Sequence, residues 1–219
     1  MNLDYNDEQT MLRDQIQKFC ESEYDFYKRE KIVKSTDDFD PNVWNLFAEQ
    51  GWLSMPFSEQ SGGLGFGPIE LSILFEEFGK ALVIEPYLST VVLSGTLLDK
   101  STYSEKNQLI EKICSGEIHI SLAYAEAENG YDYLSLNTNL DSKMILNGTK
   151  TLVLNGANDT SYTFVNTSSD TTGYTLKYRH RQTFRFDLEM KYKKKFSLGF
   201  SYVEVSLLER LFLQYLKVR

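Results

Sequence analysis

The hydrophobic period of this sequence changes at one stretch, Gly116-Glu117-Ile118-His119-Ile120-Ser121-Leu122-Ala123-Tyr124-Ala125. From Ile118 onward, large apolar residues alternate with small or polar ones, which is the two-residue period of a half-buried strand. Before this stretch, apolar residues recur every three or four positions, which is the period of an amphipathic helix. The chain therefore divides into a helical block and a β block, and the division predicts an α+β fold.

The helical block carries its own start and stop signals. Asn6 followed by Gln9 predicts a capping box at the start of the first helix. Asp40-Pro41 predicts a second start, with a capping carboxylate before a proline at the first helical position. Gly51 is expected to end that helix. Further helices are predicted from Pro68 onward and around residues 88–98 and 105–114.

The β block is expected to consist of short strands joined by tight turns. Strands are predicted at 133–140, 143–146, 151–154 and 161–165. Asn147-Gly148 and Asn155-Gly156 predict turns between them, because both residues tolerate a positive φ.

Residues 56–67 form a glycine-rich connection between two predicted helices. No Gly-Lys-Ser/Thr follows, so this is not a phosphate-binding P-loop, and Pro68 occupies the third glycine position of a dinucleotide fingerprint. We interpret the stretch as a connection that needs unusual backbone angles.

Composition excludes several classes of protein. The 219 residues are 42% hydrophobic and 25% charged, and no apolar run approaches the roughly 20 residues of a membrane span. The N-terminus lacks a basic and an apolar signal region, so we expect a cytoplasmic protein. Cys20 and Cys114 are expected to be buried reduced thiols, and no Cys/His spacing predicts a metal site.

The last 43 residues differ in charge from the rest. Residues 1–176 contain 12 basic and 27 acidic residues, whereas residues 177–219 contain 11 and 4. Basic clusters lie at 177–181 and 191–195, and Ser206 to Leu216 predicts a short amphipathic helix with a Ser206/Glu209 capping box. The basic clusters are short and match no recognised binding motif, so we expect no nucleic-acid partner, although a tail that contacts nucleic acid or membrane remains the alternative.

Three ordered segments resemble the acyl-CoA dehydrogenase family. They are Tyr5 to Arg13; Met55 to Gly65, with its Gly62-Gly63-Leu64-Gly65 motif, and then Phe75 to Ala81; and Leu122 to Asp132, followed by Leu146 to Ala157. The finer resemblance is to the small subunit of the pimeloyl-CoA dehydrogenase type, through Glu85-Pro86-Tyr87-Leu88, Tyr131-Asp132 and the run from Leu152 to Gly156.

The resemblance implies a helical N-terminal domain followed by a β-barrel-like middle domain. It implies FAD as cofactor, an acyl-CoA thioester as substrate, removal of hydrogen from its α and β carbons, and electron-transfer flavoprotein as electron acceptor. The family continues with a C-terminal helix bundle that carries the catalytic carboxylate and does not occur here. On this resemblance no residue of the chain is expected to be the catalytic base.

The resemblance also assigns cofactor contacts to two segments of the β block. The contacts it implies are Leu122, Tyr124, Ala125, Glu126, Gly130, Tyr131, Leu152, Val153 and Leu154. Ala125 stands where the family usually has a hydroxyl, Tyr131 where it has a serine, and Leu152 and Leu154 where it has Trp and Thr. Tyr124 either approaches the ligand or alternates into the β core.

We therefore expect a helical domain at 1–117, an incomplete β domain at 118–176 and an atypical tail at 177–219. The loss of resemblance near Leu176, together with the charge reversal, is typical of a shifted reading frame. On this hypothesis the chain is a truncated acyl-CoA dehydrogenase-like flavoprotein, inactive alone. The alternative is a non-catalytic small subunit that docks on a large acyl-CoA dehydrogenase subunit.

Overall fold

The structure is a computed structural model that describes residues 4–35, 39–101, 103, 105–128, 130, 137–140, 145–155, 161–168, 171–180, 190–192, 203–210 and 216–217. For residues 139–148 and from 161 onward, the description concerns the backbone alone.

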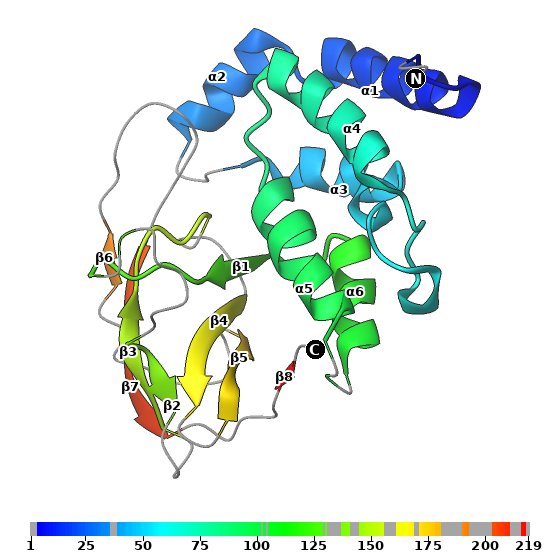
Figure 1. Ribbon diagram of the computed structural model, residues 1–219. Helices are drawn as coiled ribbons and strands as arrows, with labels where there is room; N and C mark the ends of the chain where they lie inside the picture. The colour runs from blue at the N-terminus through cyan, green and yellow to red at the C-terminus, as the bar shows by residue number, and fades with distance from the viewer. Residues whose placement is uncertain are drawn as a thin grey trace.

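The first half of the chain is helical, as predicted, and occupies the upper and right-hand parts of Figure 1. Its elements are α1 (Asp7–Glu23), α2 (Phe26–Lys34), α3 (Pro41–Glu49), η1 (Trp52–Ser54), η2 (Glu59–Ser61), α4 (Pro68–Ala81), the π-helix η3 (Leu88–Gly95), α5 (Thr96–Asp99) and α6 (Lys106–Cys114). No helix among the described residues has the length and hydropathy needed to cross a bilayer.

The predicted helix signals are confirmed. Asn6 and Gln9 form the capping box of α1, with the Asn6 side chain accepting the Gln9 N–H at 2.7 Å. The Asp40 carboxylate accepts the Asn42 N–H at 2.8 Å, and Pro41 is the first residue of α3. Gly51 follows α3 with a φ of 75°, the left-handed region that favours glycine.

An aromatic cluster holds the helical part together. Phe47 of α3 stacks on Phe78 of α4 with ring centroids 4.9 Å apart, and Trp52 lies edge-on to Phe19 of α1 at 5.0 Å. These rings are buried or nearly so. Aromatic pairs of this kind contribute about 0.5–1.5 kcal/mol each beyond the area that they bury.

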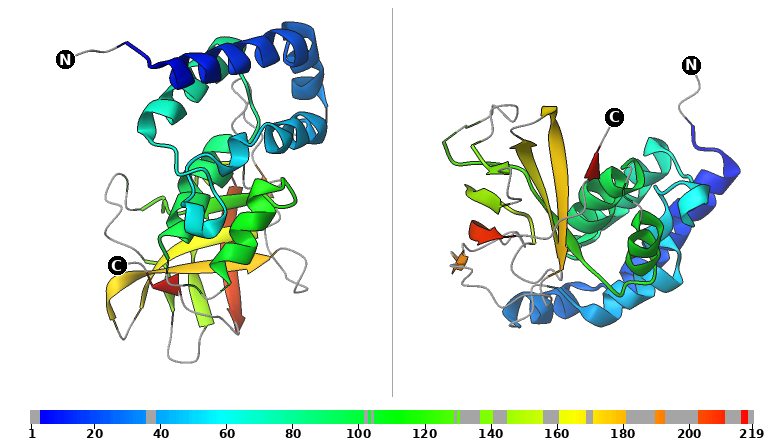
Figure 2. Two further views of the ribbon diagram at one scale, coloured as in Figure 1. Left: turned by 90° about the vertical axis from the view of Figure 1, so that its right-hand side faces the viewer. Right: turned by 90° about the horizontal axis from the view of Figure 1, so that it is seen from below.

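The described strands lie on the other side of the molecule, as the right-hand view of Figure 2 shows. They are β1 (Ile120–Ala123), β2 (Asn139–Leu140), β3 (Ile145–Lys150), β4 (Ser161–Ser168), β5 (Thr171–His180), β6 (Met190–Tyr192), β7 (Val203–Arg210) and β8 (Leu216–Lys217). Their order is β6-β7-β3-β2-β4-β5-β8, with β1 parallel to β4. β5 spans the expected boundary at 176, and the division of the chain into domains stays a prediction.

Strand β1 joins the helical part to the sheet. The Ile120 N–H donates to Thr90 Oγ1 at 3.2 Å, and Ser94 Oγ donates to the Ile120 carbonyl at 3.1 Å. Thr90 and Ser94 belong to η3, and both are buried. Two helical side chains thus satisfy the N–H and carbonyl groups of Ile120, in a strand that also pairs with β4, and they place the start of the β block against η3.

Two predictions in the β block are wrong. Asn147-Gly148 lies inside β3, where Asn147 pairs with Asn139 of β2 and with Leu208 of β7, so it makes no turn. Residues 151–154 form no strand, because Leu152 has a φ of 54°, which interrupts extended backbone. Strand β4 confirms the strand predicted at 161–165. Asn155 has a φ of 56°, as the predicted turn requires, and Gly156 lies outside the described residues.

The predicted amphipathic helix at 206–216 is wrong over residues 206–210, and residues 211–215 lie outside the described residues. Residues 203–210 form β7, which pairs antiparallel with β3 from Val205 opposite Lys150 to Arg210 opposite Ile145. Inter-strand hydrogen bonds and the β-branched Val203 and Val205 favour the strand over the helical period of the leucines.

Candidate functional site

The two segments to which the resemblance assigns cofactor contacts lie side by side. The Thr151 N–H donates to the Ala125 carbonyl at 2.8 Å, and Ser121 Oγ donates a hydrogen bond to the Leu154 carbonyl. Residues 121–125 and 151–154 therefore run in opposite directions next to each other. They are adjacent although about 30 positions separate them in the sequence.

A buried ion pair joins the same two segments. Lys150 Nζ lies 2.7 Å from Glu126 Oε1, and the two side chains are 1% and 4% exposed. The Lys150 ammonium also donates to the Tyr124 carbonyl at 3.2 Å. The Glu126 carboxylate accepts the N–H groups of Asn137 at 2.6 Å and Thr138 at 3.0 Å.

The Glu126 carboxylate is stabilised in its charged form. Burial would raise its pKa, but hydrogen bonds from Lys150, Thr138 and the main chain outweigh burial and hold the pKa at about 2. Burial lowers the pKa of Lys150, and Glu126 offsets part of that effect. Glu126 is therefore charged at neutral pH, and its carboxylate 2.7 Å from Lys150 Nζ favours the charged ammonium, which balances part of the loss of hydration.

Several of the proposed contacts remain accessible to a ligand. Leu122, Tyr124 and Leu154 are half-buried, and Leu152 is 58% exposed. The remaining described contacts differ in burial. Ala125, Glu126 and Val153 are buried, whereas Gly130 is exposed and has a φ of 54°. Tyr131 lies outside the described residues. The structure thus brings residues 122–126 together with 152–154 around a partly exposed apolar surface.

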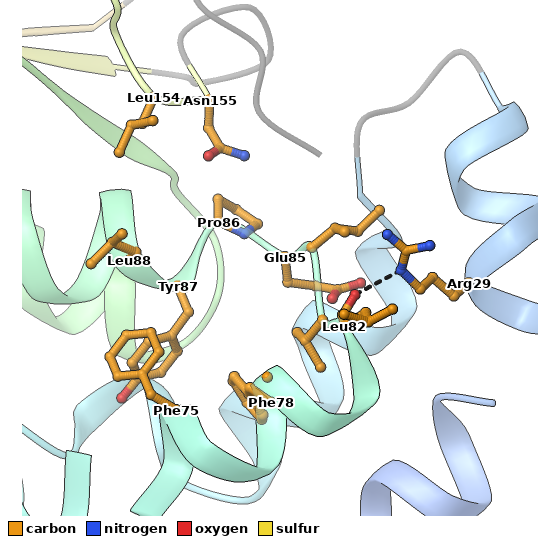
Figure 3. Close-up of a pocket in the computed structure, with 13 residues that line it drawn as sticks. Arg29, Phe75, Phe78, Leu82, Glu85, Pro86, Tyr87, Leu88, Leu154 and Asn155 are labelled. Atoms are coloured by element: carbon orange, nitrogen blue, oxygen red, sulfur yellow. Dashed lines mark hydrogen bonds between the residues drawn. The ribbon is translucent and has the colours of Figure 1, made fainter. Parts of the chain in front are cut away.

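A cavity of about 330 Å³ opens between this surface and the helical part. Figure 3 shows Phe75, Phe78 and Tyr87 on one side of it, and Leu154 and Asn155 on the other. The walls are mainly aromatic and aliphatic, so the cavity suits an apolar chain.

Two charged residues of this cavity were missed by sequence reasoning. Glu85 is 7% exposed, and burial raises its pKa to about 7, although the Tyr24 hydroxyl and nearby main-chain N–H groups favour the charged form in part. Arg29 reaches the cavity from α2 and donates from Nε to the Leu82 carbonyl at 2.8 Å. The available signal was a carboxylate within the apolar run from Leu82 to Tyr87.

A second, larger groove lies on another face of the helical part. It measures about 880 Å³ and lies between α1 and the glycine-rich connection, with Leu12, Trp52 and Met55 among its lining residues. Met11, Leu64 and Phe66 contribute exposed apolar side chains, with Met11 72% exposed.

The glycine-rich connection is held in one conformation. Asp99 accepts the Ser58 N–H at 3.0 Å and the Ser61 hydroxyl at 2.5 Å. A Cβ at Gly63 would come within 2.2 Å of the Phe57 carbonyl oxygen, so only glycine fits there. Gly62 and Gly65 have φ of 86° and 66°, so the stretch is a connection with unusual backbone angles, as predicted.

Comparison with known proteins identifies the fold that carries these sites. A profile described as "Acyl-CoA dehydrogenase, N-terminal domain" matches residues 6–117. The chain belongs to the acyl-CoA dehydrogenase family. The match covers the helices, the glycine-rich connection and the cavity-lining residues from Arg29 to Leu88.

One relative in sequence and two solved structures are similar to a larger part of the chain. Acyl-CoA dehydrogenase FadE29 of Mycobacterium tuberculosis is 31% identical over 131 residues, which is 58% of this chain and 34% of FadE29. The ChsE4–ChsE5 complex from the same organism shares the fold with a TM-score of 0.80 at 19% identity, over 95% of this chain and 56% of the matched chain. The structure described as "PigA with FAD and proline" matches with a TM-score of 0.82 at 15% identity, over 100% of this chain and 60% of the PigA chain.

This chain spans a limited part of those proteins. It covers 34% of FadE29 and 56–60% of the two chains of known structure. Among the described residues, no three His, Cys, Asp or Glu side chains come together as a metal site.

Proposed function

We propose that this chain forms the helical and strand parts of an FAD-dependent acyl-CoA dehydrogenase-like flavoprotein that acts on an acyl-CoA thioester. One observation carries the proposal. The segments 122–126 and 151–154 lie together, and Leu154 of the second segment borders a mainly apolar cavity that α4 and the residues after it line on the other side. A flat ring and an acyl chain would thereby meet at one place.

The residues present fit a flavin ring in part. Leu152, Leu154, Tyr124 and Leu122 offer apolar, partly exposed surface from two adjacent segments. The hydroxyls that the family usually has at positions 125 and 154 are absent, which we expect to weaken binding by about 0.5–1.5 kcal/mol for each lost hydrogen bond. When bound, FAD would accept the two electrons of the dehydrogenation.

The cavity is the proposed site of the acyl chain. Phe75, Phe78 and Tyr87 would contact its methylene groups and exclude water, and each buried methylene contributes about 0.8 kcal/mol. We assign no catalytic base to this chain, because in the resemblance the carboxylate base lies in a helix bundle beyond these residues. The chain alone is therefore expected to be inactive.

A second candidate function is that of a non-catalytic small subunit. The ChsE4–ChsE5 structure is a complex, and its fold is shared by this chain over 95% of its length. In this version a large acyl-CoA dehydrogenase subunit would supply the base. We further propose that the chain belongs to the pimeloyl-CoA dehydrogenase branch of the family. We also propose that its strands close into a barrel-like sheet and that the protein is located in the cytoplasm.

The apolar groove between α1 and the glycine-rich connection is the proposed docking surface for the protein electron acceptor. Exposed Met11, Leu64 and Phe66 at a groove of about 880 Å³ suit an apolar side chain of a partner. Electron-transfer flavoprotein is the acceptor that the resemblance implies.

The test measures FAD binding by fluorescence quenching, and turnover by acyl-CoA-dependent dye reduction. The chain is assayed alone and with a large acyl-CoA dehydrogenase subunit. We expect weak FAD binding and negligible turnover alone, with turnover restored if the large subunit is added. Robust turnover by the isolated chain would contradict the assigned absence of a base, and absence of FAD binding in both settings would overturn the flavoprotein proposal.

Matched leucine-to-tryptophan variants separate the two surfaces. Leu88→Trp narrows the cavity at a wall residue outside the proposed flavin contacts and should abolish acyl-CoA binding by the complex in calorimetry. Leu64→Trp changes only the groove and should retain acyl-CoA binding while it slows electron transfer to the acceptor. Equal acyl-CoA binding by both variants would place the acyl site elsewhere.

A further inference from the structure

The Glu126 carboxylate connects three places in the chain. It bonds to Lys150 at the end of β3, to the N–H groups of Asn137 and Thr138 before β2, and it belongs to the segment that follows β1. One side chain thereby ties residue 126 to residues 137 and 138. This part of the chain contains Gly130 and Tyr131, two of the cofactor contacts that the resemblance implies.

Lys150 completes the connection from the other side. Its ammonium bonds to the Tyr124 carbonyl, and the Thr151 N–H next to it bonds to the Ala125 carbonyl. Two successive carbonyl groups are therefore held by the 150–151 segment. The peptide planes of residues 124–126 are set by these bonds, which determines the direction in which the neighbouring side chains and N–H groups point.

Stability alone is a weak reason for such a pair. Burying two charges costs several kcal/mol for each ion, and a well-packed apolar pair of similar volume is often as stable. What the ion pair supplies is directional bonding among three segments, which an apolar pair cannot provide.

We propose that Lys150 and Glu126 are positioning residues that hold the two cofactor-facing segments in register and so pre-organise the surface for the flavin. The inference rests on the proposed flavoprotein function and deepens it. Neither residue needs to touch the cofactor, because each acts through the peptide groups of residues 124–126 and 137–138.

The experiment uses the full chain with Lys150→Met, Glu126→Gln and the double variant. The first readout is hydrogen exchange at the amides of Asn137, Thr138 and Thr151, which needs no cofactor. The second is the FAD dissociation constant together with the visible circular dichroism of the bound flavin, measured well below the unfolding temperature. Lys112→Met is the control, because it removes an ion pair with Glu117 at 2.9 Å that is 47% and 59% exposed.

We expect exchange at the three amides to rise in each single variant, and the FAD dissociation constant to increase roughly tenfold, the effect of one lost charged hydrogen bond. The flavin dichroism should change with it. The double variant should differ from the sum of the single variants, because it leaves no unpaired buried charge. If a single variant does not fold, amide exchange and FAD binding in the double variant still test whether the ion pair holds residues 124–126 against residues 150–151.

Unchanged exchange at all three amides in the folded variants would overturn the inference. So would a lower unfolding temperature with an unchanged FAD dissociation constant and dichroism, because that pattern is purely structural. If the unaltered chain binds no FAD, the flavoprotein proposal fails, and the exchange readout alone decides whether the pair holds the segments together.

Discussion

At the scale of single residues, Glu85 shows how burial changes an acid. It follows the apolar run from Leu82 to Ile84 and lies at the cavity wall, 7% exposed. Burial disfavours its charged form and raises its pKa from 4.5 to about 7. The folded state therefore holds the Glu85 proton more tightly than the unfolded state does.

The first prediction follows from this difference. As pH rises from 4.5 to about 7, Glu85 loses its proton in the unfolded state first, so its contribution to the free energy of unfolding falls by up to about 3 kcal/mol. Glu85→Gln removes this dependence. Urea denaturation gives the free energy of unfolding of the variant minus that of the unaltered chain. This difference should be more positive at pH 8 than at pH 5.

The control for this prediction is Glu111→Gln, at an exposed position of α6. The difference in free energy of unfolding between Glu111→Gln and the unaltered chain should be the same at pH 8 and pH 5. If Glu85→Gln behaves in the same way as the control, Glu85 is not a desolvated carboxyl group.

At the scale of elements, glycines with opposite surroundings give a second prediction. A Cβ at Gly63 meets Phe57 backbone and side-chain atoms at 2.2–2.5 Å, whereas at Gly79, within α4, nothing lies within 4 Å. Gly63→Ala should lower the free energy of unfolding by at least roughly 2 kcal/mol. Gly79→Ala should raise it by about 0.5–1 kcal/mol, because alanine is the better helix former.

Both variants are compared by denaturant unfolding with the unaltered chain. A Gly63→Ala chain of unaltered stability would mean that the connection has room to move away from Phe57. It would also contradict the description of the glycine-rich connection as held in one conformation by the Asp99 contacts.

The capping box of α1 gives a third prediction. Asn6→Ala removes the acceptor of the Gln9 N–H and should cost about 1 kcal/mol. Gln17→Ala, on the exposed face of the same helix, serves as the control and should change stability by less than about 0.5 kcal/mol. Equal effects of the two substitutions would show that the cap contributes nothing beyond helix propensity.

Elements of the β block show where local signals fail. Asn147-Gly148 has the composition of a hairpin turn, yet its backbone pairs on both sides, with β2 and β7. A turn signal reports what the backbone tolerates, and a partner strand on each side gives those residues more hydrogen bonds than a turn would.

At the scale of the whole molecule, two buried carboxyl groups and one half-buried histidine predict the dependence of stability on pH. Burial lowers the pKa of His119 from 6.5 to about 4, so its contribution to stability is lost as pH falls from 6.5 to 4. Glu85 acts with the opposite sign between pH 7 and 4.5. Glu126, whose pKa is lowered from 4.5 to about 2, loses its contribution as pH falls through that range.

The free energy of unfolding should therefore change little between pH 7 and 5 and fall steeply below pH 4.5. Denaturation curves at pH 7, 5 and 3 measure this profile. His119→Phe should make the chain gain stability between pH 7 and 5, because Glu85 then acts unopposed. A steep loss already at pH 5 in the unaltered chain would contradict the offset.

The order of the residues was enough to predict the helical half and the family. Capping boxes, prolines at helix starts and the glycine after α3 act through hydrogen bonds between residues at most four positions apart, so their effect is visible in the residue order. Three features appear only in the folded chain: Lys150 pairs with Glu126, Glu85 borders a cavity, and residues 203–210 form a strand. These features depend on which distant segment lies opposite and how much water it excludes, and neither is encoded in a local pattern.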